Sequence, residues 1–202
     1  MKLVIASNNQ NKIREIKSIL DGQFDEIISM GEAGYHEEIE ETGTTFRENA
    51  LIKARHVMEK MGCAALADDS GLEVYALGGR PGVYSARYSG EHGDDEANNL
   101  KLVKEMHNVP EKGRQARYAC VIALCRPGMD ELTAEGFCEG VILREPRGNG
   151  GFGYDPYFFM EAFDQTMAEM DIEIKNKISH RYNALKGLSA LLKGEDEDTT
   201  DK

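Results

Sequence analysis

Two adjacent carboxylates, Asp68 and Asp69, end an apolar run in the stretch ALADDSGLEV at 65–74. Burying like charges together is unfavourable, so we expect either solvent or a cation to stabilise them. Glu40 and Glu41 lie in a polar loop before a predicted helix, and carboxylates from separate segments can converge on one hard cation. Magnesium fits, since one or two carboxylates plus ligand phosphates can hold it. The alternative is that all four acids are ordinary solvated residues.

The polar stretch SNNQNK at 7–12 joins a predicted strand to a predicted helix. A turn in this position directs backbone N–H groups toward whatever lies in front of the helix, which suits phosphate. The predicted phosphate ligands are Ser7, Asn8, Asn9, Gln10, Asn11 and Lys12. A P-loop is excluded, because the G-x-x-x-x-G-K-[ST] pattern is absent here. A plain capped turn is the other interpretation. Lys53 could supply a second cation, although many lysines beside an apolar stripe only extend toward solvent.

Two further segments could bind a flat ring. The stretch GNGGFGYDPYFF at 148–159 is rich in glycine, which allows a close backbone approach, and it offers Phe152, Gly153, Tyr154 and Asp155. Lys175, Ser179, His180 and Arg181 cluster in a predicted helix start, where positive charges oppose the helix dipole and a bound anion or ring edge would explain them. Either segment could instead be purely structural.

The segments that position these residues alternate between strands and helices. Apolar runs predict strands at 2–7, 24–29, 63–69, 72–77, 116–125 and 131–143. Apolar residues at helical spacing predict helices at 12–20, 44–62, 94–106 and 173–193, with a capping box at Thr45 and Glu48. We therefore predict one mixed α/β unit. Residues 1–194 form one domain, which Gly194 ends, and the acidic tail 195–202 is disordered.

The composition excludes several classes of protein. The chain of 202 residues is 41% apolar and 30% charged, as in ordinary globular proteins. Its formal charge of -12 argues against a nucleic-acid partner, which needs a basic face. No run approaches the roughly 20 apolar residues of a membrane span, and MKLVIASNN has too short an apolar core for a signal peptide. We expect a cytoplasmic protein, in which four cysteines without C-x-x-C spacing are buried thiols.

Together these segments describe a site for a nucleoside triphosphate, and they resemble the inosine triphosphate pyrophosphatase family. The matching stretches, in the family's order, are SNNQNK, EETGTTFRENALIKA, ALADDSGLEV, GRPGVYSARYSG, GNGGFGYDPYF and KNKISHRYNAL. They cover nearly the whole chain except the acidic tail. ADDSGLEV, GGFGYDP and SHR-x-x-AL in that order are highly specific. Asn11 stands where many members of the family have glycine.

The resemblance implies an α/β fold with a long mixed central β-sheet flanked by helices, which forms two lobes with a cleft between them. It also implies a homodimer and a magnesium-dependent reaction. The enzyme would hydrolyse non-standard purine nucleoside triphosphates (ITP, dITP, XTP) to the monophosphate and pyrophosphate. Residues 7–12 and Lys53 would hold the phosphates, and Ser70 would touch the substrate. Asp69 would be the general base, and the metal would sit on Asp69 with Glu40, with Glu41 or Asp68 as further candidates nearby. The resemblance implies that the purine base of the substrate is bound by Phe152, Gly153, Tyr154, Asp155, Lys175, His180 and Arg181.

Three points stay open at this stage. Asp68 and Asp69 would face opposite sides if one strand continued through both, whereas a turn at 70–71 could bring them together. A pyrophosphatase for modified pyrimidines or methylated bases is one competing function, but the SHR-x-x-AL ending disfavours it. A non-catalytic nucleotide sensor is another, but it would need neither Glu40 nor Asp69.

Overall fold

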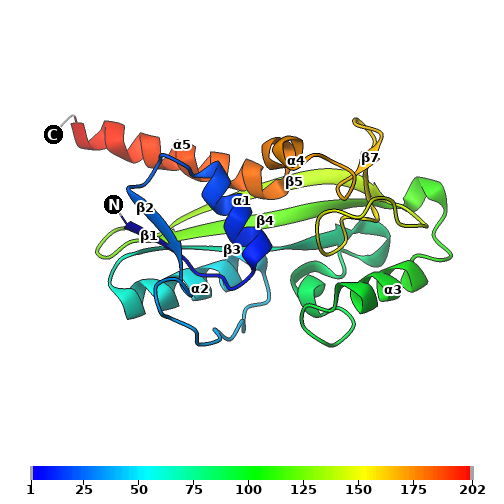
Figure 1. Cartoon of the computed structure of the whole chain (residues 1–202), viewed down its shortest axis with the longest axis horizontal. Helices are drawn as coiled ribbons and strands as arrows, with labels where there is room; N and C mark the ends of the chain where they lie inside the picture. The colour runs from blue at the N-terminus through cyan, green and yellow to red at the C-terminus, as the bar shows by residue number, and fades with distance from the viewer. Residues whose placement is uncertain (1, 201–202) are drawn as a thin grey trace. The chain divides into compact units, whose positions relative to one another are not determined.

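A computed structural model describes the backbone of residues 2–200 and the side chains of residues 2–194. The strands are β1 (Lys2–Ile5), β2 (Glu26–Ser29), β3 (Ala64–Val74), β4 (Gln115–Cys125), β5 (Leu132–Ile142), β6 (Phe158–Met160) and β7 (Gln165–Thr166). The helices are α1 (Gln10–Ile19), α2 (Phe46–Met61), α3 (Asp95–Glu105), α4 (Ile172–Ile178) and α5 (His180–Thr200) (Figure 1). Short 3-10 segments span Tyr75–Leu77, Gly82–Arg87 and Glu111–Gly113.

The predicted mixed sheet is confirmed. Seven strands form one sheet in the order β2-β1-β3-β4-β5-β6-β7. β1 pairs in parallel with β2 and β3, whereas β6 pairs antiparallel with β5 and β7. The chain divides into two compact units: unit 1 comprises residues 1–69, 120–136 and 180–202, and unit 2 comprises 70–119 and 137–179. The predicted cleft stays a prediction.

The strands of unit 1 are apolar on both faces, and helices cover each face. Successive residues of a strand point to opposite faces, so the side chains of β1 and β3 alternate between two cores. The core beneath α1 and α5 includes Leu3, Ile5, Leu66, Ile122 and Leu188. The core against α2 includes Val4, Ala65, Ala67, Ala54 and Val57. Accordingly, Figure 1 shows α1 and α5 on one side of these strands and α2 on the other.

Unit 2 has a separate core, to which both strands and loops contribute. It includes Leu72, Leu102, Tyr118, Ile142, Tyr154 and Phe158. The aromatic loop predicted from GNGGFGYDPYFF therefore belongs partly to this core, because the ring of Phe158 packs 4.4 Å from that of Tyr118, centroid to centroid. This packing ties the loop to β4.

Some predicted boundaries hold and others need correction. The capping box at Thr45 and Glu48 is confirmed, and Gly62 ends α2 in the left-handed conformation. The strand predicted at 63–69 and the first half of the one predicted at 72–77 are a single strand, β3, with no turn between them, whereas Tyr75–Leu77 form a 3-10 segment and not a strand. The last predicted helix is two helices, because Ser179 adopts an extended conformation between α4 and α5.

The C-terminal boundary also differs from the prediction. The backbone of α5 continues to Thr200, so the predicted end of the helix at Gly194 is wrong. The predicted disorder of the tail concerns residues 195–202. The side chains of 195–200 and all of 201–202 lie outside the described residues.

Gly136 of β5 allows the first turn of α5 to approach the sheet closely. A Cβ at this position would lie 2.2 Å from both the backbone N of Ala184 and the backbone O of His180. Neither backbone atom can move without shifting the helix. The absence of a side chain at 136 therefore sets where α5 starts.

We predict that Gly136→Ala destabilises the fold by about 3 kcal/mol, because overpacking against backbone forces the helix outward. For a chain of this size the melting temperature should fall by roughly 6–12 °C. The control is Gly194→Ala, within α5 itself, where a Cβ meets nothing within 4 Å. Thermal unfolding monitored by circular dichroism distinguishes them, and equal melting temperatures would contradict the close approach.

Candidate active site

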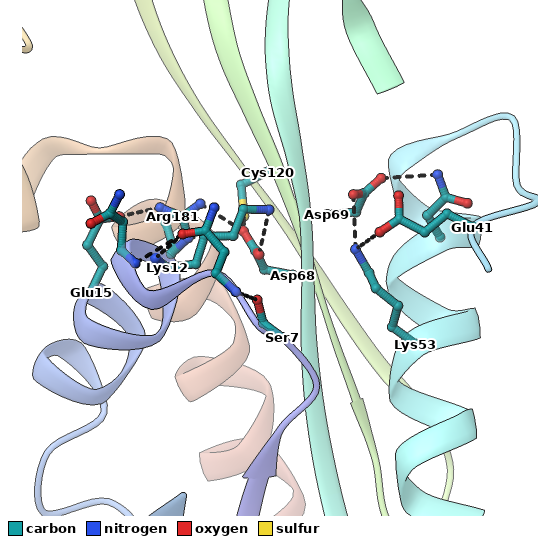
Figure 2. A network of polar contacts seen from close by, with 12 residues as sticks. Ser7, Lys12, Glu15, Glu41, Lys53, Asp68, Asp69, Cys120 and Arg181 are labelled. Carbon is teal, nitrogen blue, oxygen red and sulfur yellow. Dashed lines mark hydrogen bonds and ion pairs between the residues drawn. The ribbon is translucent and has the colours of Figure 1, made fainter. Parts of the chain in front are cut away.

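Asp68 and Asp69 continue the alternation of β3, and this separates their charges. Because the strand is uninterrupted, no turn at 70–71 brings the two carboxylates together. Asp68 follows Leu66 onto the face covered by α1 and α5, and Asp69 follows Ala67 onto the face covered by α2. Figure 2 shows the two side chains on opposite sides of the strand. Strand β3 therefore separates the two acids, and each acid is paired with its own cations.

Asp68 is buried in an ion cluster. Lys12 Nζ lies 2.9 Å from Oδ1, and Arg181 donates to Oδ2 from Nε and Nη2 at 3.0 and 2.9 Å. Arg181 also donates through Nη1 to the buried carboxylate of Glu15 on α1. Burial alone would raise the pKa of Asp68, but the charges of Arg181 and Lys12 hold that pKa below its usual range. Asp68 thus stays ionised and anchors Lys12, and its role as a metal ligand stays a prediction.

The turn at 7–12 is a capped helix start. Asn9 is the N-cap of α1, and its Oδ1 accepts from the N–H groups of Asn11 and Lys12 at 3.0 and 3.2 Å. Ser7 Oγ accepts from the N–H of Asn9 at 3.1 Å. These three backbone donors are already used, which corrects the expectation that they point at a phosphate. The anion-binding capacity rests instead on Lys12 and on the exposed side chains Asn8, Asn9 and Gln10.

Asp69 is held from α2. Lys53 Nζ lies 3.1 Å from Oδ1 of Asp69 and 2.7 Å from Oε1 of Glu41, and Asn49 Nδ2 donates to Oδ2 of Asp69 at 3.3 Å. Burial raises the pKa of Asp69 against the opposing charge of Lys53. Burial lowers the pKa of Lys53, but Asp69 and Glu41 outweigh it and raise that pKa. A buried carboxylate with raised proton affinity beside a fixed cation is typical of a general base.

Glu41 and Asp69 are the acids best placed to hold a metal. Both bond to Lys53 Nζ, so their oxygens lie near a common point, and an all-oxygen pair suits a hard cation. Glu40 is exposed, and Asp68 faces the other side of β3. Among the side chains that the structure describes, no three His, Cys, Asp or Glu groups form a ready-made metal site. A cation here would need further oxygens from a ligand or water.

The predicted ring-binding residues form a tightly bonded loop in unit 2. Asp155 is buried, and its Oδ2 accepts from the N–H of Phe152 at 2.9 Å and from Lys175 Nζ at 2.6 Å. Tyr118 donates its hydroxyl to Oδ1 of Asp155 at 3.2 Å. Lys175 Nζ lies 4.9 Å from the centroid of the half-buried Phe152 ring. An aromatic ring, an acid and a lysine are thus brought together as the sequence predicted.

Tyr154 plays a different part from the one predicted. Its ring is buried in the core of unit 2, and its hydroxyl donates to the carbonyl of Ser85 at 2.8 Å. Tyr154 therefore anchors the loop and does not present a ring surface to a ligand. Ser70 is half-buried on β3, directly after Asp69.

The cations of KNKISHRYNAL lie on two helices. Lys175 is in the last turn of α4, where a positive charge is favourable, so the argument from an opposed helix dipole does not apply to it. His180 and Arg181 are buried at the start of α5 in unit 1. Arg181 bonds to Asp68 and Glu15 and so belongs to the ion cluster, and its role in base reading stays a prediction.

Sequence reasoning missed three polar residues at these clusters. Asn49 lies four residues before Lys53 and Glu15 three residues after Lys12, so helical spacing puts each pair on one face. That spacing was a usable signal for both. Tyr118 lies within an apolar strand, and no local pattern marks it.

A mixed α/β sheet with buried acids beside lysines on one unit, and a bonded aromatic loop on the other, defines a nucleotide-handling α/β protein. The profile of the Ham1 family matches residues 3–191. The chain therefore belongs to the Ham1 family.

Similar proteins agree with this assignment. A dITP/XTP pyrophosphatase of Bacillus licheniformis is 52% identical over 191 residues, which cover 95% of this chain and 97% of that protein. The dITP/XTP pyrophosphatase of Bacillus subtilis is 50% identical over 189 residues, covering 94% and 96%. The solved structure of the Staphylococcus aureus Ham1 protein is 44% identical, with a TM-score of 0.86 over 96% of this chain and 100% of that one. The resemblance seen in the sequence is confirmed.

Proposed function

We propose that this protein hydrolyses non-standard purine nucleoside triphosphates (ITP, dITP and XTP) to the nucleoside monophosphate and pyrophosphate. Its action would remove these nucleotides from the pool before they enter DNA or RNA. The names of the Bacillus relatives support this substrate class. The observation that carries the proposal is the buried Asp69 carboxylate, which shares Lys53 with Glu41.

The residues of unit 1 divide the phosphate chemistry between the two faces of β3. Lys12, held by Asp68, offers a cation to the phosphates. Asp69, whose pKa is raised by burial, accepts the proton of the attacking water. Lys53 keeps Asp69 oriented through the ion pair and balances negative charge beside it. Asp68 can therefore stay ionised while Asp69 takes up the proton.

We propose magnesium as the cofactor, held by Glu41 and Asp69. A divalent cation at these oxygens would neutralise phosphate charge and make a bound water easier to deprotonate. The geometry favours Glu41 over Glu40, because only Glu41 bonds to Lys53.

We predict that Glu41→Gln raises the magnesium concentration required for half-maximal activity at least about tenfold, since it removes one of two anionic ligands. The adjacent change Glu40→Gln should leave that concentration nearly unchanged. Magnesium titrations of initial rate compare the two variants directly. The reverse order of effects would assign the metal to Glu40.

The residues of unit 2 suit a 6-oxo purine. Lys175 can donate to an oxygen at C6, Asp155 can accept from a ring N–H, and Phe152 can stack on the ring. An adenine amino group at C6 would leave the donor unpaired, and such a mismatch in a dry site costs a factor of roughly 10⁴.

The test is pyrophosphate release by the purified protein with magnesium, comparing ITP, dITP and XTP with ATP and GTP. Fast release from the first three and little from the last two supports the proposal. Binding without release would favour the nucleotide sensor. Equal release from all five would keep the phosphate chemistry and refute the account of base selection.

Two accompanying proposals rest on the resemblance. The protein would act as a homodimer, which sedimentation analysis would show. It would work in the cytoplasm, where free nucleotides are available. No helix in the described part of the chain is long and apolar enough to cross a bilayer.

A further inference from the structure

Two side chains of α3 hold the backbone of the aromatic loop. Asp95 and Asn99 are four residues apart and so share one face of the helix. Asp95 Oδ2 accepts from the N–H of Gly153 at 2.7 Å, and Asn99 Nδ2 donates to the carbonyl of Gly153 at 2.8 Å. A single loop residue is therefore fixed through both of its backbone polar groups by one helix.

The backbone conformation of Gly153 determines the course of the aromatic loop next to Phe152. Its φ is 61°, in the left-handed region that favours glycine, and it directly follows Phe152. Asp155 already bonds to the N–H of Phe152. With Gly153 also held, the backbone on both sides of the Phe152 Cα is fixed, and so is the direction of the Cα–Cβ bond from which its ring extends. Phe152 stays half-buried, which leaves ring surface available to a ligand.

The bonding of Asn99 differs from that of its neighbour Asn98. Asn98 uses both ends of its amide, accepting from the N–H of Ser89 at 2.7 Å and donating to the carbonyl of Ala86 at 3.4 Å. Asn99 is about nine-tenths buried, yet within the described structure its Oδ1 has no hydrogen-bond partner. An unpaired buried acceptor costs free energy. The gain that offsets this cost is the bond to Gly153, a residue of the ring-binding loop.

We propose that Asp95 and Asn99 are positioning residues for base selection, which orient Phe152 and Asp155 toward a 6-oxo purine. This inference rests on the proposed function and deepens it. Both side chains bond to the loop backbone and not to the residues assigned to the phosphate chemistry. Loss of either bond should reduce the selectivity for a 6-oxo purine over adenine, while the phosphate chemistry of Asp69 and Lys53 stays in place.

The experiment measures kcat/KM for dITP and dATP in Asp95→Ala and Asn99→Ala. Matched controls are Asp94→Ala, which loses one bond to the N–H of Ala97, and Asn98→Ala, which loses two bonds outside the aromatic loop. We expect kcat/KM for dITP to fall about tenfold in the first pair, and the dITP:dATP ratio to narrow by a similar factor. The controls should keep the wild-type ratio. Amide hydrogen exchange should speed up in a peptide covering 148–157 only in the first pair.

Four outcomes separate the possibilities. An equal fall in kcat/KM for dITP and dATP, together with a lower melting temperature, would show that the two residues have only a structural role and would overturn the inference. Asp95→Asn should restore the wild-type ratio, since an amide oxygen can still accept from Gly153, and failure to do so would also count against it. If the wild type releases no pyrophosphate, the proposed function fails. Unchanged hydrogen exchange of residues 148–157 in Asp95→Ala and Asn99→Ala would instead show that these two side chains do not hold the loop. The Asp95 variants suffice if Asn99→Ala does not fold.

Discussion

Asp69→Asn should lower the rate of pyrophosphate release by about 10²–10⁴-fold, the range for loss of a general base. The amide keeps the size of the side chain but can neither take a proton nor carry charge to a cation. Folding should survive, because Lys53 retains its bond to Glu41 and the burial that raises the pKa of Asp69 no longer acts on a charge. Initial rates with dITP and magnesium give the comparison.

Nucleotide binding provides the control for this variant. A non-hydrolysable dITP analogue, titrated by calorimetry, should bind Asp69→Asn within a few-fold of the wild type, because Lys12 and the aromatic loop are untouched. Turnover that survives the change would show that another group is the base. Lost binding with intact turnover per bound substrate would make Asp69 a binding residue only.

Arg181→Met should destabilise the protein by about 3–5 kcal/mol, because it leaves the buried carboxylates of Asp68 and Glu15 without their main cation. The melting temperature should fall by roughly 6–20 °C. The deficit should depend on pH. In the wild type the depressed pKa of Asp68 stabilises the fold above its unfolded pKa, and that gain is lost only as pH falls through the folded value. In the variant the carboxylate can be protonated at higher pH, so the deficit should shrink on acidification.

Urea unfolding at neutral and mildly acidic pH measures this deficit. Arg14→Met is the control, since Arg14 is exposed on α1 and should contribute within about 0.5 kcal/mol. A stable Arg181→Met variant that instead loses its preference for dITP over dATP would support the base-reading role predicted for Arg181.

The sequence was sufficient for elements with strong local signals. The capping box of α2 and the helical spacing of its apolar residues located that helix, and the apolar runs located β1 and β4. The pairing of Lys175 with Asp155 was also within reach, because both residues lie in motifs that were read as one base site. These predictions depend on short stretches whose chemistry is self-contained.

Other features depend on residues far apart in the chain. The burial of Arg181 follows from contacts with Asp68 and Glu15, more than a hundred residues away, so a cluster of cations in sequence looked like an exposed ligand site. The uninterrupted strand β3 was missed because Ser70 and Gly71 have turn propensity. Gly71 is instead required there because a Cβ would lie 2.4 Å from Ser85 Oγ. Packing against another segment thus overrode local preference.

The length of β3 carries information that its composition does not. Side chains alternate with a period of two, so the loss of one residue between Ala64 and Ala67 would exchange the faces of the two following acids. Asp68, which anchors Lys12, would then face Lys53, and Asp69, the proposed general base, would face Arg181. Substitutions in this segment change single packing contacts, whereas an odd-numbered insertion or deletion removes both functions at once. Homologous genes should therefore tolerate changes of length in the loop at 31–39, before the acids Glu40 and Glu41, far more readily than in this strand.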